Sequence, residues 1–275
     1  MTEKPTTACQ RRFVAGLVIL ACMLLSACAT SPLGRHQLKL FSPQKISQMG
    51  AMAFKQTAQK TPVSHDAALT QFVQCVAQAI TAQTNYTANW NVKLFHSDQV
   101  NAFALPGGEI GVYSGLFKVA QNQAQLAAVL GHEVSHVIAG HANERMSDAA
   151  VAQLGMQVAG ASGAVGAGTM ALLGMGAQVG ILLPFSRAQE SEADLMGLDL
   201  MSRAGFDPRQ AVVLWQRMQH AGGKTPPELL SDHPSDARRI ANIQARVPRD
   251  LPIYNSAVAA HGGPQCGPVP KGVSG

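Results

Sequence analysis

The chain has 275 residues, of which 47% are hydrophobic and 13% are charged, and its formal net charge is +5. This length is sufficient for one domain with a well-formed hydrophobic core. The positive charge is modest and forms no clustered basic stripe, so we expect no nucleic-acid partner.

Residues 1–27 show the order of features that is typical of a secretory signal. Basic residues precede an apolar run from Phe13 to Leu25, which is too short for a comfortable membrane span. The run ends in the four residues 25–28 (LSAC), a pattern typical of a lipobox, in which Cys28 is lipidated and becomes the mature N-terminus. An ordinary signal peptide with a chance cysteine is the alternative interpretation.

The residue after this cysteine predicts where such a lipoprotein is sent. Ala29 follows Cys28, and not the aspartate that, by resemblance to bacterial lipoproteins, would imply retention at the inner membrane. We therefore expect a lipid anchor in the outer membrane, with the chain facing the periplasm. Loss of residues 1–27 would lower the net charge from +5 to +3.

Of the five cysteines, two are expected to remain as thiols. Cys9 and Cys22 leave with the signal peptide and Cys28 takes the lipid, so Cys75 and Cys266 are left. Two thiols in an oxidising periplasm favour a disulfide, although the sequence does not give the distance between them.

The remaining chain divides into three predicted parts. Residues 28–43 are expected to be a tether, residues 44–248 a single domain, and residues 249–275, which are rich in Pro and Gly, a tail that Cys266 would pin.

Local patterns at the start of the domain predict two helices and a small antiparallel sheet. The helices are Ser42–Lys60 and Ser64–Ala82, and each begins with a Ser that can cap it. The expected strands are Trp90–Phe95, Gln99–Leu105 and Glu109–Tyr113. An extended peptide can add itself to an edge of such a sheet. A plain structural hairpin is the alternative, and the two interpretations are compatible.

The central pattern is H-E-x-x-H at residues 132–136, within a run, Leu126–Arg145, that predicts a helix. Residues four apart share a helix face, so His132 and His136 can present two imidazoles to one ion. Zinc takes two such nitrogens and leaves positions for a third ligand and a water. Glu133 is rotated by about a hundred degrees from His132, where it can accept a proton from that water. Two unrelated histidines on one helix are the alternative.

The register of this motif excludes one subclass of zinc peptidases. In the longer H-E-x-x-H-x-x-G-x-x-H form, Gly would fall at position 139 and His at position 142, and both positions are Ala here. Gly140 and His141 are one residue out of step, and on a continuous helix His141 would lie on the far side from His132. The third ligand must therefore come from elsewhere.

Two acids on the next predicted helix, Ser186–Ala204, are the candidates for this role. Glu190 and Asp194 are four apart and share a face. One can bind zinc while the other accepts a hydrogen bond from a liganding imidazole and fixes its tautomer. Glu192 is the competing ligand, but it has no acidic partner four residues on. Acids that merely complement the helix dipole are the alternative.

The segment between these helices, Ala149–Phe185, has no charged residue and is rich in Gly. This composition predicts packed helices with small-residue contacts. The alternatives are a segment that touches the membrane and a movable flap over the predicted zinc site.

These motifs, in this order, resemble those of the gluzincin zinc metallopeptidases. The family includes the CAAX prenyl endopeptidase, HtpX, BepA and LoiP, and the likeness is to single-domain lipoprotein proteases of the LoiP kind. It covers roughly residues 44–247. The matching elements are H-E-V-S-H with His141 and Arg145, the Arg187–Asp194 pattern, the stretch Asn101–Gly108, and Asp232-His233-Pro234 with Arg239.

The resemblance implies an α+β, zincin-like fold that is mostly helical, with a small antiparallel sheet whose edge strand faces the zinc cleft. It also implies zinc-dependent endopeptidase activity and one zinc per chain, bound by His132, His136 and Glu190. The transmembrane helices of HtpX and the prenyl endopeptidase are not expected, so prenylated substrates are not implied.

We expect the substrates to be unfolded, misfolded or misassembled envelope proteins, with the outer-membrane assembly machinery as a candidate partner. Glu133 would act as general base, and Asp194 would support a zinc ligand. His233 or Arg239 would stabilise the oxyanion. His233 has a second open role, as a latch that occupies the open position on zinc until substrate displaces it. A zinc-bound holdase or scaffold that does not cut is the alternative function.

Overall fold

The structure is a computed structural model that describes residues 28–161, 185–221, 229, 231, 233 and 237–270. It is predominantly helical with two small sheets, which confirms the predicted α+β, zincin-like class. The predicted signal peptide and residues 162–184 of the uncharged segment lie outside the described residues. Within the described ranges, no helix combines the length and the apolar character that crossing a membrane requires.

The first two helices of the domain begin at different kinds of cap. α2, Pro43–Lys60, begins after Ser42, whose hydroxyl accepts a hydrogen bond from the Lys45 amide, as predicted. α3, Ala67–Thr81, begins after Asp66 and not after Ser64. Ser64 is held in extended chain because its amide bonds to the Leu94 carbonyl, so the helix starts later than the sequence predicted.

The larger sheet has the order β3-β5-β4, with β3 spanning Asn91–Phe95, β4 spanning Ala102–Leu105 and β5 spanning Glu109–Tyr113. β4 and β5 form an antiparallel hairpin, but β3 pairs with β5 in parallel. The prediction of a purely antiparallel sheet is therefore wrong for β3, because β5 and not β4 is its neighbour. β5 is paired on both sides, so the Glu109–Tyr113 strand offers no edge, and β4 is an edge strand.

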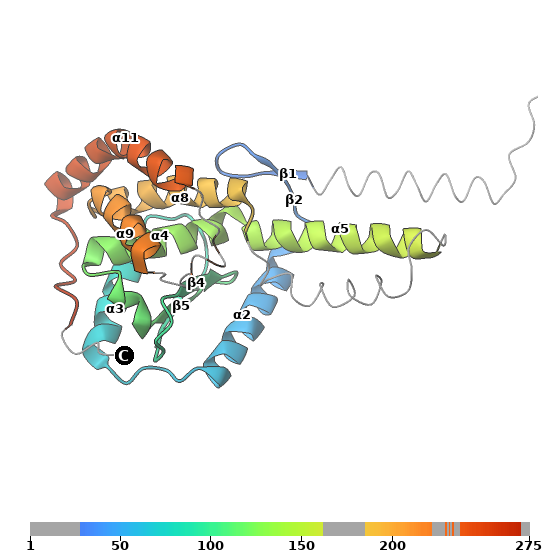
Figure 1. The fold of residues 1–275 in the computed structure, drawn as a ribbon, viewed down its shortest axis with the longest axis horizontal. Helices are drawn as coiled ribbons and strands as arrows, with labels where there is room; N and C mark the ends of the chain where they lie inside the picture. Colours follow the sequence, from blue (N-terminus) through green and yellow to red (C-terminus); the bar gives the residue numbers. More distant parts are fainter. Residues whose placement is uncertain are drawn as a thin grey trace, which may run out of the picture.

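The core of the domain is built around α4, Gln123–Ala139, which lies between the sheet and helices α8 and α9 (Figure 1). α8 spans Arg187–Arg203 and α9 spans Arg209–Ala221. α4 and α8 cross at Gly131 and Gly197, where a Cβ on either glycine would come within 2.8 Å of the facing backbone. This close approach brings the acids of α8 next to the histidines of α4.

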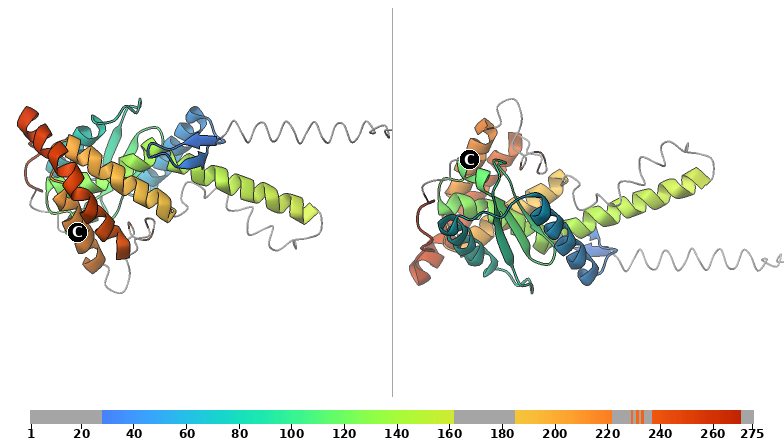
Figure 2. Two further views of the ribbon diagram at one scale, coloured as in Figure 1. Left: turned by 90° about the horizontal axis from the view of Figure 1, so that it is seen from above. Right: turned by 90° about the horizontal axis from the view of Figure 1, so that it is seen from below.

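The predicted helix Leu126–Arg145 is broken in two. Gly140, with a φ of 73°, ends α4, and α5 begins at His141 and runs to Ala161. A left-handed residue at the end of a helix is a common position for glycine. Figure 2 shows that α5 projects away from the body of the domain. The turn at Gly140 redirects His141, which a continuous helix would have placed elsewhere.

Both ends of the described chain are more ordered than the sequence predicted. The expected tether contains β1, Cys28–Thr30, and β2, His36–Leu38, which form an antiparallel hairpin. The expected boundary at residue 248 falls inside α11, Ala237–His261, which continues past Pro248 and Pro252. A disulfide joins Cys75 of α3 to Cys266, with a Cα–Cα distance of 5.7 Å.

Candidate metal centre

The helix α4 presents both histidines of the H-E-x-x-H motif to one point. His132, Glu133 and His136 are all buried, and the Nε2 atoms of the two histidines lie 3.0 Å apart. They meet because residues four apart share a helix face. Ligand atoms around a tetrahedral zinc stand about 3.3 Å apart, given zinc–nitrogen bonds of about 2.0–2.1 Å.

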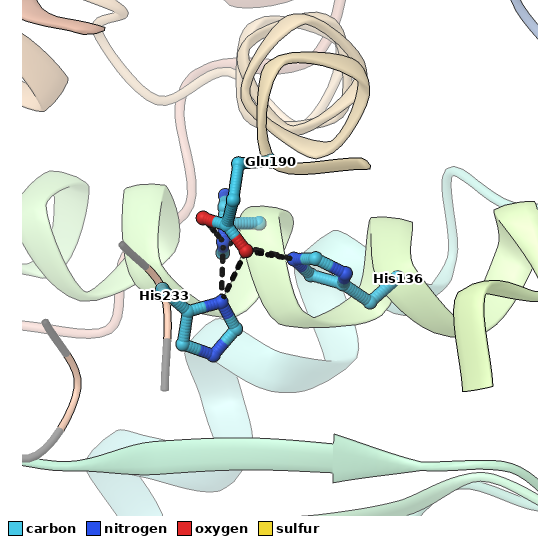
Figure 3. A group of neighbouring side chains, drawn as sticks. His136, Glu190 and His233 are labelled. Atoms are coloured by element: carbon cyan, nitrogen blue, oxygen red, sulfur yellow. Dashed lines mark hydrogen bonds and ion pairs between the residues drawn. The ribbon is translucent and has the colours of Figure 1, made fainter. Parts of the chain in front are cut away.

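Glu190 of α8 completes this arrangement from the opposite side. Its Oε1 lies 3.4 Å from His136 Nε2, and its Oε2 lies 3.5 Å from His132 Nε2. Figure 3 shows its carboxylate pointing toward His136 and His233. Glu192, the competing ligand, lies outside the cluster and instead contacts Arg35 and His141.

His233 occupies a fourth place in the cluster. Its Nδ1 lies 2.9 Å from Glu190 Oε1 and 3.2 Å from His132 Nε2, and its Nε2 lies 3.4 Å from Glu133 Oε1. One ligand atom from each of His132, His136, Glu190 and His233 falls within 4.8 Å of the other three. Asp232 and Pro234, the neighbours of His233 in the predicted element, lie outside the described residues.

Asp194 and Arg239 support the cluster from behind. His132 Nδ1 lies 2.9 Å from Asp194 Oδ1, as the four-residue spacing from Glu190 predicted for one of the two acids. Arg239 donates from Nη2 to Asp194 at 2.7 Å and lies 3.2 Å from Glu190, while its guanidinium stacks on Trp215 at 3.5 Å. Among the described residues that line the cavity beside Glu133, Arg239 is absent. Arg239 thus contacts the acids that face the histidines, and its role toward an oxyanion stays a prediction.

The donor set fits zinc. Glu190 Oε2 and Glu133 Oε1 are buried without a hydrogen bond. Burial and Arg239 both lower the pKa of His132, yet Glu190 and Asp194 raise it to about 9, so this point of the structure favours a positive charge. Burial lowers the pKa of His136, which keeps its imidazole neutral, the form that binds a metal.

Glu133 faces a cavity beside the edge strand β4. A cavity of about 390 Å³ lies between β4, α2 and the start of α5, and it is lined by Glu133, His136 and His233 together with Phe103, Ala104 and Phe185. The backbone of Ala104 in β4 hydrogen-bonds to Glu133, so the edge strand and the acid are tied together. Burial raises the pKa of Glu133, which makes this carboxylate a better proton acceptor.

Several residues of the site were not found from the sequence. Trp215 supports Arg239, and Phe185 lies over His136 with ring centroids 3.7 Å apart. His141 contacts His136, and Arg35 contacts Glu192. Gly140 was the available signal for His141, because a glycine there can end the helix. The others come together only through tertiary contacts.

Comparisons with known proteins agree with this geometry. The family model described as Peptidase family M48 matches residues 64–247. The mitochondrial metalloendopeptidase OMA1 of Schizosaccharomyces pombe is 37% identical over 183 residues, which cover 65% of this chain and 53% of that protein. The beta-barrel assembly-enhancing protease of Escherichia coli K12 is 31% identical over 218 residues, 75% of this chain and 44% of that protein.

The chain spans about half the length of these curated relatives. The family match covers the cluster of α4 and α8 together with β4 and His233. It confirms the family that the four sequence motifs predicted, and the chain belongs to peptidase family M48.

Proposed function

We propose that the chain is a zinc-dependent endopeptidase that hydrolyses peptide bonds of misfolded or misassembled envelope proteins. One observation carries the proposal. Glu133, whose Oε1 has no hydrogen bond, borders both the cluster of His132, His136 and Glu190 and the cleft beside β4. A structural zinc site has no need of such a base.

The edge strand β4 is the element that would align the substrate. An extended peptide that pairs with β4 gains main-chain hydrogen bonds, which are independent of its side chains. The Ala104 backbone of this edge interacts with Glu133, so a peptide paired with β4 would lie beside the base. Such pairing requires unstructured chain, which supports unfolded or misassembled proteins as the substrate class.

His132, His136 and Glu190 would hold the zinc, which when bound supplies Lewis acidity that activates a water and polarises the scissile carbonyl. Glu133 accepts the proton of the water at its carboxylate and returns it to the leaving amine. Asp194 holds the imidazole of His132 through Nδ1, and Arg239 holds Asp194. These contacts keep the ligands oriented before a substrate arrives.

His233 serves as a latch. Its Nδ1 contacts Glu190 and His132, and the residue also lines the cavity beside Glu133. Displacement of His233 would free the space that it takes beside Glu190 and Glu133. A protease that works among healthy neighbours benefits from such a resting state.

Attachment to the outer membrane through a lipid on Cys28 completes the proposal. Cys28 is exposed at the first residue of β1, where an acyl chain could leave the domain. The assembly machinery for outer-membrane proteins is the proposed partner, because the E. coli relative carries beta-barrel assembly in its name. Incorporation of labelled palmitate into the chain, and its loss in Cys28→Ser, is the expected result; equal labelling would contradict the anchor.

One observation favours a second candidate, a zinc-bound holdase that does not cut. With His233 included, the cluster offers a closed set of protein ligands, as structural zinc sites do. The catalytic proposal explains the presence of His233 in the cluster as a resting state, which substrate ends by displacing His233.

Digestion of casein and of a denatured outer-membrane protein separates the two candidates. Wild type should cleave both, and Glu133→Gln should keep its zinc while losing about 10²–10⁴-fold in rate. Equal loss of substrate with wild type and with Glu133→Gln, or no loss with either, would support the holdase.

A further inference from the structure

The metal-ligand candidate His136 is held by a chain of contacts that leads away from the cluster. Its Nδ1 lies 2.9 Å from Nδ1 of His141, and Nε2 of His141 lies 3.2 Å from Oε2 of Glu192. All three side chains are buried, with 2%, 0% and 4% of their surface exposed. Hydrogen bonds in such a setting are strong and orient their partners closely.

The chain of contacts ends in the hairpin of β1 and β2. Glu192 accepts from the Leu33 amide at 3.2 Å and from Arg35 Nε at 3.1 Å, and the Ser31 side chain also hydrogen-bonds to it. Arg35 extends further, to Glu144 of α5, with its Nη2 at 2.6 Å from Oε2. The turn between β1 and β2 thus holds the carboxylate of Glu192 against His141 with donors from Ser31, Leu33 and Arg35.

We infer that this chain of contacts fixes the tautomer of His136 and so makes the hairpin part of the metal centre. An ionised carboxylate only accepts hydrogen bonds, so His141 must donate to Glu192 from Nε2. A neutral His141 then has its lone pair on Nδ1, where it accepts the Nδ1 proton of His136. His136 is left with its lone pair on Nε2, the atom that faces His132 Nε2 at 3.0 Å and Glu190.

The two histidines of the pair are therefore oriented by different routes. Asp194 of α8 acts on His132 directly, in one contact of 2.9 Å. Glu192, also of α8, acts on His136 through His141, and depends on residues 31–35 of the turn between β1 and β2. His141, Glu192 and Arg35 are accordingly positioning residues for a zinc ligand. The inference rests on the proposed function only in that the cluster binds zinc.

Zinc affinity of the full chain, measured by competition with a chromophoric chelator, tests the role of His141. His141→Phe keeps a ring of similar size but has no acceptor, and it should weaken zinc binding by about 10- to 100-fold. His141→Gln should recover most of the affinity, because its amide oxygen can accept the Nδ1 proton of His136. A purely structural role for His141 predicts that affinity follows thermal stability and not the presence of an acceptor.

A second pair of variants tests the hairpin. Arg35→Met should weaken zinc binding severalfold, since Glu192 loses its charged partner. Arg203→Met is the matched control. Arg203 of α8 also pairs with an acid, Asp199, at 2.7 Å, but this pair is not part of the chain of contacts that leads to His136. Arg203→Met should leave zinc affinity unchanged. Equal affinity for wild type and Arg35→Met would remove the hairpin from the metal centre.

The tautomer itself is read from the ring ¹⁵N shifts of His136 in the zinc-free full chain. A proton on Nδ1 in the wild type, and a mixture of tautomers in His141→Phe, are the expected results. A proton on Nε2 in the wild type overturns the inference, and so does wild-type zinc affinity in His141→Phe. If wild type binds no zinc at all, the proposed function fails, and the ¹⁵N measurement still decides the tautomer.

Discussion

The Nδ1 atom of His132 lies 2.9 Å from Oδ1 of Asp194, one helical turn beyond Glu190 on α8. Two acids on one face of α8 therefore have different contacts: Glu190 faces the Nε2 atoms of His132 and His136, and Asp194 faces Nδ1 of His132. Asp194→Asn should weaken zinc binding by about 10- to 100-fold, because a neutral amide holds the imidazole less firmly. Asp199→Asn, on the same helix, is the control for chelator competition, and equal effects of the two would contradict the role of Asp194.

The two glutamates of α8 should differ in metal content. Glu190→Gln removes a predicted ligand and should leave the purified protein largely without zinc, whereas Glu192→Gln should retain more, because Glu192 lies outside the cluster. Elemental analysis of both proteins gives zinc per chain. An empty site in Glu192→Gln with a full site in Glu190→Gln would reverse the ligand assignment.

The latch predicts that His233→Ala keeps or gains activity. The variant opens the place that His233 takes beside Glu190 and Glu133. An oxyanion donor, in contrast, would cost about 10²–10³-fold in rate when removed. Peptide turnover with zinc content measured on the same sample decides between the roles, and a deep loss with zinc still bound excludes a purely inhibitory latch.

The disulfide should make a large contribution to stability. Cys75 and Cys266 are 191 residues apart, and a bridge that closes so long a loop restricts the unfolded chain. Cys266→Ser should lower the free energy of unfolding by about 2–5 kcal/mol in denaturant titration. Mass spectrometry of non-reduced material should show the linked peptides, and free thiols at both positions would contradict the bridge.

Acid should weaken the docking of the hairpin on α5. Burial alone would raise the pKa of Glu144, but hydrogen bonds from Arg35 and Gln189 hold it below the ordinary value of 4.5. The pair with Arg35 therefore contributes stability above pH 4.5, and this contribution is lost as the pH falls through the lowered pKa.

The unfolding temperatures of wild type and Glu144→Gln should accordingly differ at neutral pH and converge in acid. Asp98→Asn is the control, since the pair of Asp98 with Lys118 lies at the surface and should matter little at any pH. A difference for Glu144→Gln that persists at low pH would show that the ion pair is not its cause.

The local parts of the fold and site were predictable from the sequence. Ser42 and Pro43 mark the start of α2, and the spacing of His132 with His136 and of Glu190 with Asp194 puts each pair on one helix face. These features depend on residues within one turn of each other, so pattern alone is sufficient.

Features that depend on distant residues were missed or placed wrongly. The parallel pairing of β3 with β5 depends on which strands become neighbours in the folded sheet, and local sequence patterns do not show this. The hairpin at residues 28–38 looked like a tether because its partners, Glu144 and Glu192, lie more than a hundred residues away. The contacts of Arg239 with Trp215 and Asp194 were not predicted, because they depend on how α8, α9 and α11 pack.

The crossing of α4 and α8 at Gly131 and Gly197 makes assembly of the centre conditional on folding. Glu190 lies 54 residues beyond His136 in the chain, and only this crossing brings the two together. In an unfolded chain the ligands are dispersed, so the free energy of zinc binding becomes free energy of folding. Under the proposed function, the chain therefore could not cut a peptide until α4 and α8 have packed against each other.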